Sequence, residues 1–105
     1  MELTDFEQVR REVLRWMVLV VANTSDSSGV TEAFLKGSLA GHFPVLPSDV
    51  LRHEVRYLEG RGYLHVHASE AAPWRAVITA NGVDLVEYRA ECPASIARPK
   101  RSAGI

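Results

Sequence analysis

The stretch from residue 46 to residue 78 constrains the fold most, because a helical repeat passes directly into two alternating segments. Three apolar residues recur at the spacing of one buried helix face: Leu51, Val55 and Leu58. Ser48 is suited to cap the start of this helix, and Asp49 suits its positive first turn. We therefore expect a helix over residues 48–59.

Two short strands are expected to follow this helix. The Gly-Arg-Gly sequence of residues 60–62 is a helix stop. Residues 63–67 and 74–78 both alternate between apolar and polar side chains, as half-buried strands do. The Ala, Ser, Glu and Pro residues between them are expected to form the connection of a β-hairpin, which is a candidate wing.

The polar face of the expected helix carries Arg52, His53 and Arg56, which can donate hydrogen bonds to base edges or phosphates. The alternative is an ordinary solvated face, and the acids Asp49, Glu54 and Glu59 favour it. With further cations near the hairpin and at the chain end, the candidate DNA contacts are Ser48, Arg52, His53, Arg56, Arg61, Arg75, Lys100 and Arg101.

The first helix is expected to begin at Thr4, which forms a capping box with Glu7. One apolar stripe runs along it, and we expect this stripe to face the core: Phe6, Val9, Val13, Trp16, Met17 and Val20. A second stripe lies about 120° away by the helical repeat. That stripe either packs within the same domain or meets a second copy of the chain. We favour a homodimer held by the first and last helices, through Leu14, Val18, Val21 and Val86.

The remaining elements are read from turn and cap signals. Residues 23–29 are all Asn, Thr, Ser, Asp or Gly, so we expect a solvated loop. A helix starting near Thr31 should turn its apolar residues inward and stop at Gly41; these residues are Phe34, Leu35 and Leu39. Thr79 is expected to cap a last helix.

Length and charge place limits on the fold and on partners. A chain of 105 residues that is 47% hydrophobic suits one compact domain, expected over residues 1–91. The net charge of −1 provides no overall attraction to nucleic acid. The last 14 residues, 92–105, hold three cations and no acid, together with Pro93 and Pro99. We expect that basic tail to be disordered.

Several other function classes find little support. Cys92 is the single cysteine and has no neighbouring base, no catalytic motif is present, and we expect neither enzyme activity nor a cofactor. His65 and His67 share one side of a strand and could hold a metal, but a zinc site usually needs four ligands, so we prefer two surface histidines. The longest apolar run, residues 16–22, is too short to span a bilayer. No secretion signal opens the chain, and we expect a cytoplasmic protein.

The expected element order resembles that of the winged helix-turn-helix superfamily, including ArsR-like bacterial regulators, and residues 48–64 carry most of the likeness. A closer likeness is to a family of small proteins encoded in Mu-like prophages. It rests on four segments: residues 10–15, 55–59, 78–84 and 98–101. The resemblance implies an α+β fold: a three-helix core, a two-stranded hairpin wing and a C-terminal helix. It also implies a dimer with helix 48–59 in the major groove of double-stranded DNA, acting as a transcriptional regulator. The alternative is a winged helix that binds another protein.

Overall fold

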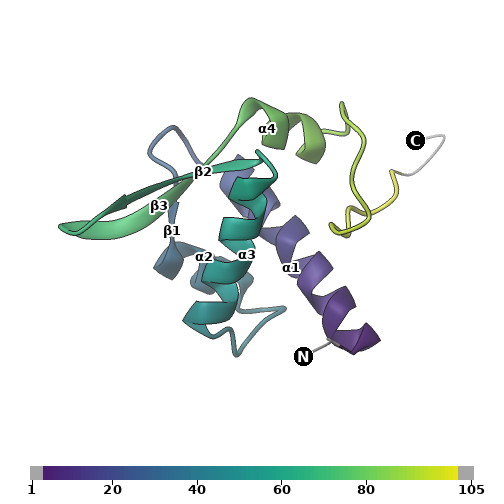
Figure 1. The fold of residues 1–105 in the computed structure, drawn as a ribbon, viewed down its shortest axis with the longest axis horizontal. Helices are drawn as coiled ribbons and strands as arrows, with labels where there is room; N and C mark the ends of the chain where they lie inside the picture. The colour runs from purple at the N-terminus through teal and green to yellow at the C-terminus, as the bar shows by residue number, and fades with distance from the viewer. Residues whose placement is uncertain (1–3, 102–105) are drawn as a thin grey trace.

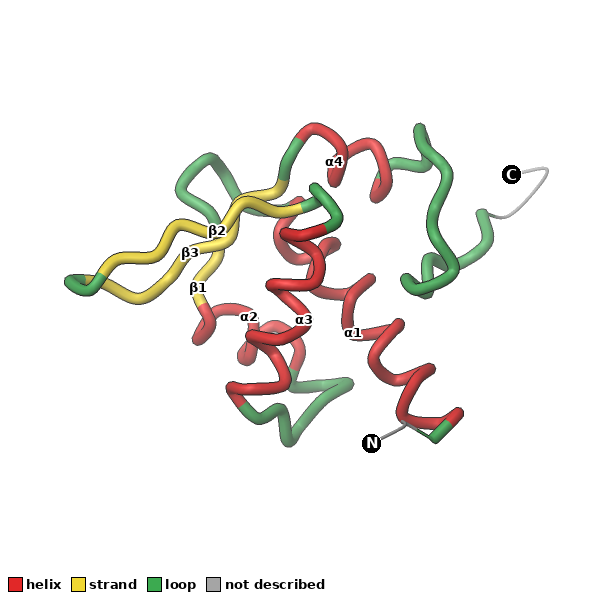
Figure 2. The backbone as a smooth tube through the Cα atoms, viewed as in Figure 1, coloured by secondary structure: helices red, strands yellow, loops and turns green. Residues whose placement is uncertain are grey.

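A computed structural model describes residues 4–101 of the chain, and its class is α+β. Seven elements follow one another: α1 (Asp5–Asn23), β1 (Val30–Thr31), α2 (Glu32–Leu39), α3 (Ser48–Gly60), β2 (Leu64–Ser69), β3 (Ala72–Ile78) and α4 (Ala80–Val86). The helices gather on one side, and the β2–β3 hairpin projects away from them (Figure 1). The segment after α4 lies at the opposite end of the molecule from the hairpin tip (Figure 2).

Threonine side chains begin three of the four described helices, as their sequence positions predict. The hydroxyls of Thr4, Thr31 and Thr79 each accept a hydrogen bond from the backbone N–H three residues later, which satisfies one free amide of the first turn. α3 is different. Its N-cap residue is Pro47, which makes no side-chain cap, so the prediction that Ser48 caps this helix is wrong.

The end of α3 follows the expected glycine signal. Gly62 adopts a left-handed backbone with φ of 85°, which a residue with a Cβ rarely adopts. There the N–H of Gly62 donates to the carbonyl of Glu59, and the N–H of Tyr63 donates to that of Leu58. The chain therefore turns directly from α3 into β2.

The sheet has three antiparallel strands in the order β1-β3-β2, one more than the hairpin expected from sequence. β1 lies just after the solvated loop and pairs Val30 with Ala76 and Thr31 with Arg75. β2 and β3 continue closer to the tip than their alternation indicated, so only Glu70 and Ala71 separate the two strands. The expected hairpin is present, and a two-residue β1 completes the sheet on the other edge of β3.

The two apolar stripes of α1 are buried to a different extent from that expected from sequence. Leu14 and Val18 are 2% and 0% exposed within a single chain, so they belong to the core and not to a dimer contact. Of the other stripe, Phe6 and Val9 are 72% and 54% exposed, whereas Val13, Trp16 and Met17 are partly buried against the core. The remaining predicted dimer residues, Val21 and Val86, are half-buried against the same core.

Most other core predictions are confirmed, with one exception in α2. The predicted inner residues of α3 are buried, as are two of the three in α2: Leu51, Val55, Leu58, Leu35 and Leu39. Phe34 is 53% exposed, so its predicted inward position is wrong. A helix of eight residues buries a narrow stripe, and Leu35 and Leu39 occupy it four residues apart.

The segment from 92 to 101 packs against the helices, contrary to the expectation of a disordered tail. Ile96 is 4% exposed, and the N–H of Ala97 donates to the carbonyl of Glu12 in α1. The Arg98 guanidinium donates to the carbonyls of Leu85 and Ala90. These contacts make the segment part of the domain, which therefore continues past residue 91.

No helix among residues 4–101 is both long enough and apolar enough to cross a membrane.

Candidate nucleic-acid interface

The outer face of α3 carries the sequence-predicted cations. Arg52, His53 and Arg56 are all exposed, and the two arginine side chains retain 60% and 59% of their accessible surface. The opposite side of the helix is buried in the core. A shallow hollow of about 60 Å³ separates this face from the hairpin; its walls are Arg52, Val55, Arg56, Val66 and Trp74.

Glu32, the first residue of α2, organises the start of this face. Its carboxylate accepts hydrogen bonds from Arg52 Nε at 2.8 Å, Ser48 Oγ at 2.8 Å and Trp74 Nε1 at 3.3 Å. Partial burial would raise the pKa of Glu32, but these hydrogen bonds outweigh it and leave the pKa below its ordinary value. The Ser48 hydroxyl also accepts from Lys36 Nζ at 2.7 Å. Ser48 is thus engaged inside the protein rather than presented to a ligand.

Glu59 performs the corresponding role at the other end of α3. Its carboxylate accepts from the N–H of Val66 at 2.9 Å and from Arg56 Nη1 at 2.8 Å. The Val66 hydrogen bond, followed by that from Arg56, lowers the pKa of Glu59. β2 is an edge strand, so its outward N–H groups have no partner strand, and the Glu59 carboxylate accepts a hydrogen bond from one of them. Glu59 therefore fixes the hairpin to α3.

Replacing Glu59 with glutamine should make the free energy of unfolding depend less on pH at acid pH. The folded-state pKa of Glu59 lies below its ordinary 4.5. The ionised carboxylate therefore contributes fully to the free energy of unfolding at pH values above 4.5. That contribution disappears as the pH falls through the lowered folded-state pKa. Urea unfolding of Glu59→Gln across this acid window should show a smaller dependence on pH than the parent.

Glu70→Gln is the matched control, because Glu70 is an exposed acid in the hairpin turn. Its profile should follow that of the parent. Equal slopes for Glu59→Gln and the parent would contradict the assigned role of Glu59.

Arg75 does not join the α3 cations. In an antiparallel pair, residues directly opposite each other share a face, and Ala76 opposite Val66 faces the core. Arg75, opposite His67, therefore points to the other side of the sheet. There it lines a hollow with Asp26 and Phe34, beside the loop that precedes β1.

The other predicted cations are also dispersed. Arg61 is exposed at the C-terminal end of α3. Lys100 and Arg101 are exposed in the segment after α4, where the Arg101 guanidinium lies 5.5 Å from the ring centroid of Tyr88. That segment is remote from the hairpin in Figure 1. In a single chain, Arg52, His53 and Arg56 therefore lie together on one face. The other predicted cations lie on different parts of the surface.

The histidine pair on β2 packs ring against ring. The centroids of His65 and His67 lie 4.4 Å apart at an interplanar angle of 77°. Within residues 4–101, no group of three or more His, Cys, Asp or Glu side chains is placed to hold a metal ion. The pair remains two exposed imidazoles on the outer side of the sheet.

Glu54 is the residue whose role the sequence concealed. It lies on α3 among the polar residues, yet its side chain is fully buried. Its carboxylate accepts from Arg15 Nε at 2.6 Å and from Arg11 Nη1 at 2.8 Å, both on α1. Arg15 also stacks over Tyr57, 4.0 Å from the ring centroid, and donates to the carbonyl of Ser95. This network joins α3 to α1 and to the C-terminal segment behind the cationic face.

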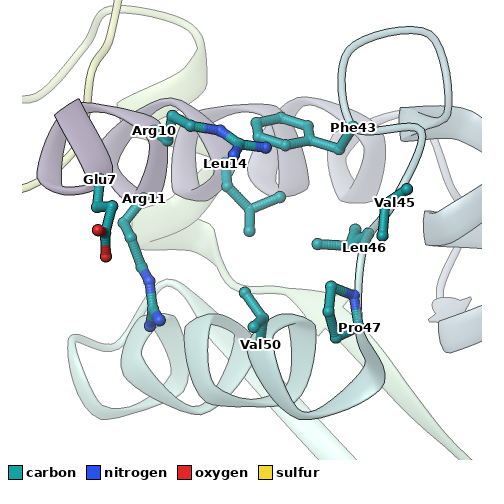
Figure 3. A pocket seen from close by; sticks show the side chains of 9 residues that line it. All are labelled: Glu7, Arg10, Arg11, Leu14, Phe43, Val45, Leu46, Pro47 and Val50. Carbon is teal, nitrogen blue, oxygen red and sulfur yellow. The ribbon is translucent and has the colours of Figure 1, made fainter.

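A second groove lies between α1 and the start of α3, on a different part of the surface (Figure 3). It measures about 280 Å³ and holds Leu14 at its centre, with Arg10 near Phe43 at its α1 rim. None of the sequence-predicted DNA contacts lines it. The groove is therefore separate from the α3 face.

Comparison of the chain with protein-family models, with curated proteins and with solved structures finds no match.

Proposed function

We propose that this chain is a winged-helix protein that binds double-stranded DNA, with α3 in the major groove and the β2–β3 hairpin as the wing. The proposal extends to a transcriptional regulator of prophage type, in line with the resemblance of its sequence segments. A helix of 13 residues with a cationic outer face, next to a projecting hairpin, has the geometry that such docking needs.

The observation that carries the proposal is how the two arginines are held. Arg52 uses Nε to bind Glu32, and its two terminal nitrogens make no hydrogen bond within the described residues, in a side chain that is 60% exposed. Those nitrogens can pair with guanine O6 and N7 in the major groove. Arg56 uses a single nitrogen on Glu59 and keeps its other donors. Both side chains are thereby oriented before any ligand arrives, which lowers the entropy lost on binding.

The test is a fluorescence anisotropy titration of the full chain with labelled duplex fragments of its source genome, at two salt concentrations. We expect binding at low salt that weakens as salt rises, with a slope of about 0.9 for each phosphate neutralised. Because Glu32 and Glu59 already pair with the two arginines of this face, we expect few phosphate contacts and a shallow slope.

A second candidate is a winged helix that binds another protein. The observation in its favour is that Glu32 and Glu59 each neutralise one arginine of the α3 face. Phosphate attraction is weaker for a face of this kind. Absence of duplex binding by the parent at low salt would overturn the DNA proposal and leave the protein-binding one.

A further inference from the structure

Part of one apolar face of α1 is left uncovered by the rest of the described chain. Phe6 is 72% exposed, Val9 54% and Val20 37%, and all three lie on the stripe opposite the buried one. Val13 between them is half-buried. Contiguous apolar surface of this kind on a small domain commonly marks a contact with another molecule.

The spacing on this face is that of a coiled coil. Counting heptads from Phe6, the a positions are Phe6, Val13 and Val20, and the d positions are Val9 and Trp16. Trp16 is half-covered by Tyr88, which meets its ring edge-on at 6.2 Å. The a and d positions of the first two turns are the most exposed. A seam with this repeat selects a partner helix with the same repeat.

We propose that the occupant of this face is a second copy of the chain, with the two α1 helices parallel along a two-fold axis. In this register Asp5 occupies a g position and Arg10 occupies the e position five residues later. Asp5 therefore faces Arg10 of the partner subunit, and symmetry creates the pair twice. In the antiparallel arrangement, g positions meet g positions, and this complementarity is lost.

The proposed contact and the core use different sides of α1. Leu14 and Val18, which anchor α1 to its own core, lie on the other side of the helix from Phe6 and Val9. The dimer uses none of the α3 face, so its test does not depend on DNA binding. The interface differs from the one expected from sequence, because Leu14 and Val18 are buried in the core, whereas Phe6 and Val9 are accessible to a second chain.

Two glutamate substitutions on α1 distinguish the interface from the core, with light scattering for mass and thermal melting for folding. Val9→Glu should shift the mass from twice the chain mass to the chain mass and keep a cooperative melting transition, lowered only by the loss of the dimer, because Val9 is exposed in the monomer. Val18→Glu buries a charge in the core and should abolish or sharply lower the melting transition. A parent protein at the chain mass at its highest soluble concentration would overturn the proposal, as would a Val9→Glu variant that stays dimeric.

Cysteine cross-linking tests the parallel register. Identical residues face each other across a parallel pair, so Val9→Cys in a Cys92→Ser background should form an intermolecular disulfide on mild oxidation. Ala33→Cys, exposed on α2, is the control and should not. Arg10→Glu should weaken the dimer several-fold, and adding Asp5→Lys should restore it. A dimer that neither cross-links through residue 9 nor recovers in the charge swap would overturn the parallel arrangement.

Discussion

Replacing Glu54 with alanine should cost about 3–5 kcal/mol of unfolding free energy, because it leaves two arginines facing a buried site without their acid. Glu54 is 0% exposed, and Arg15 is only 8% exposed, so water cannot readily take the place of the missing carboxylate. The same change removes two charge-assisted hydrogen bonds between α1 and α3. Urea unfolding monitored by circular dichroism measures the loss.

Two further variants separate the buried charge from the size of the side chain. Asp49→Ala removes an exposed acid from the first turn of the same helix and should cost under about 1 kcal/mol. Glu54→Met together with Arg15→Met replaces the buried pair with apolar groups and should recover part of the loss, although Arg11 remains. A cost for Glu54→Ala as small as that for Asp49→Ala would show that the network does not hold α1 to α3.

Structural features that depend on only a few neighbouring residues could be predicted from the sequence. Thr4, Thr31 and Thr79 each cap a helix because the bond they make reaches only three residues along the chain. Gly62 ends α3 for a similarly local reason, the left-handed backbone of a single residue. The expected hairpin also follows from alternation in its two strands. These features need no knowledge of distant parts of the chain.

Which face of a helix becomes buried depends on contacts that periodicity does not describe. α1 carries two apolar stripes, and the repeat alone ranks the longer one, with Phe6 and Val9, as the core face. The structure buries Leu14 and Val18 instead, and α2, α3 and α4 all pack against α1. β1 was missed for a related reason: two residues are too few to alternate, and only pairing with β3 makes them a strand.

Long-range polar contacts were equally hidden. Arg15 and Glu54 are 39 residues apart, and either would be a surface charge on a simple helical projection. Ser95 lies 80 residues from Arg15, and this contact helps to order a segment whose composition indicates disorder. At the candidate interface, sequence located the exposed Arg52 and Arg56 but not the acids that orient them, Glu32 and Glu59.

If α3 reads DNA, replacing both Arg52 and Arg56 with alanine should remove duplex binding while the fold stays intact. Each lost base contact should cost about 1–3 kcal/mol of binding free energy, and each lost phosphate contact should lower the salt slope by about one. Both side chains are more than half exposed, so neither supports the core. Glu59 keeps its hydrogen bond from Val66, so the hairpin should remain attached to α3.

The measurement is an anisotropy titration across salt concentrations, with thermal melting of the same variants. Arg89→Ala is the matched control, since Arg89 is an exposed, ion-paired arginine beyond α4 and away from the α3 face. It removes one positive charge and should therefore change affinity only slightly, through the general field of the protein. Normal melting with unchanged affinity in the double variant would place the DNA contact elsewhere on the chain. An equal loss in Arg89→Ala would mean that overall charge, and not the geometry of α3, governs binding.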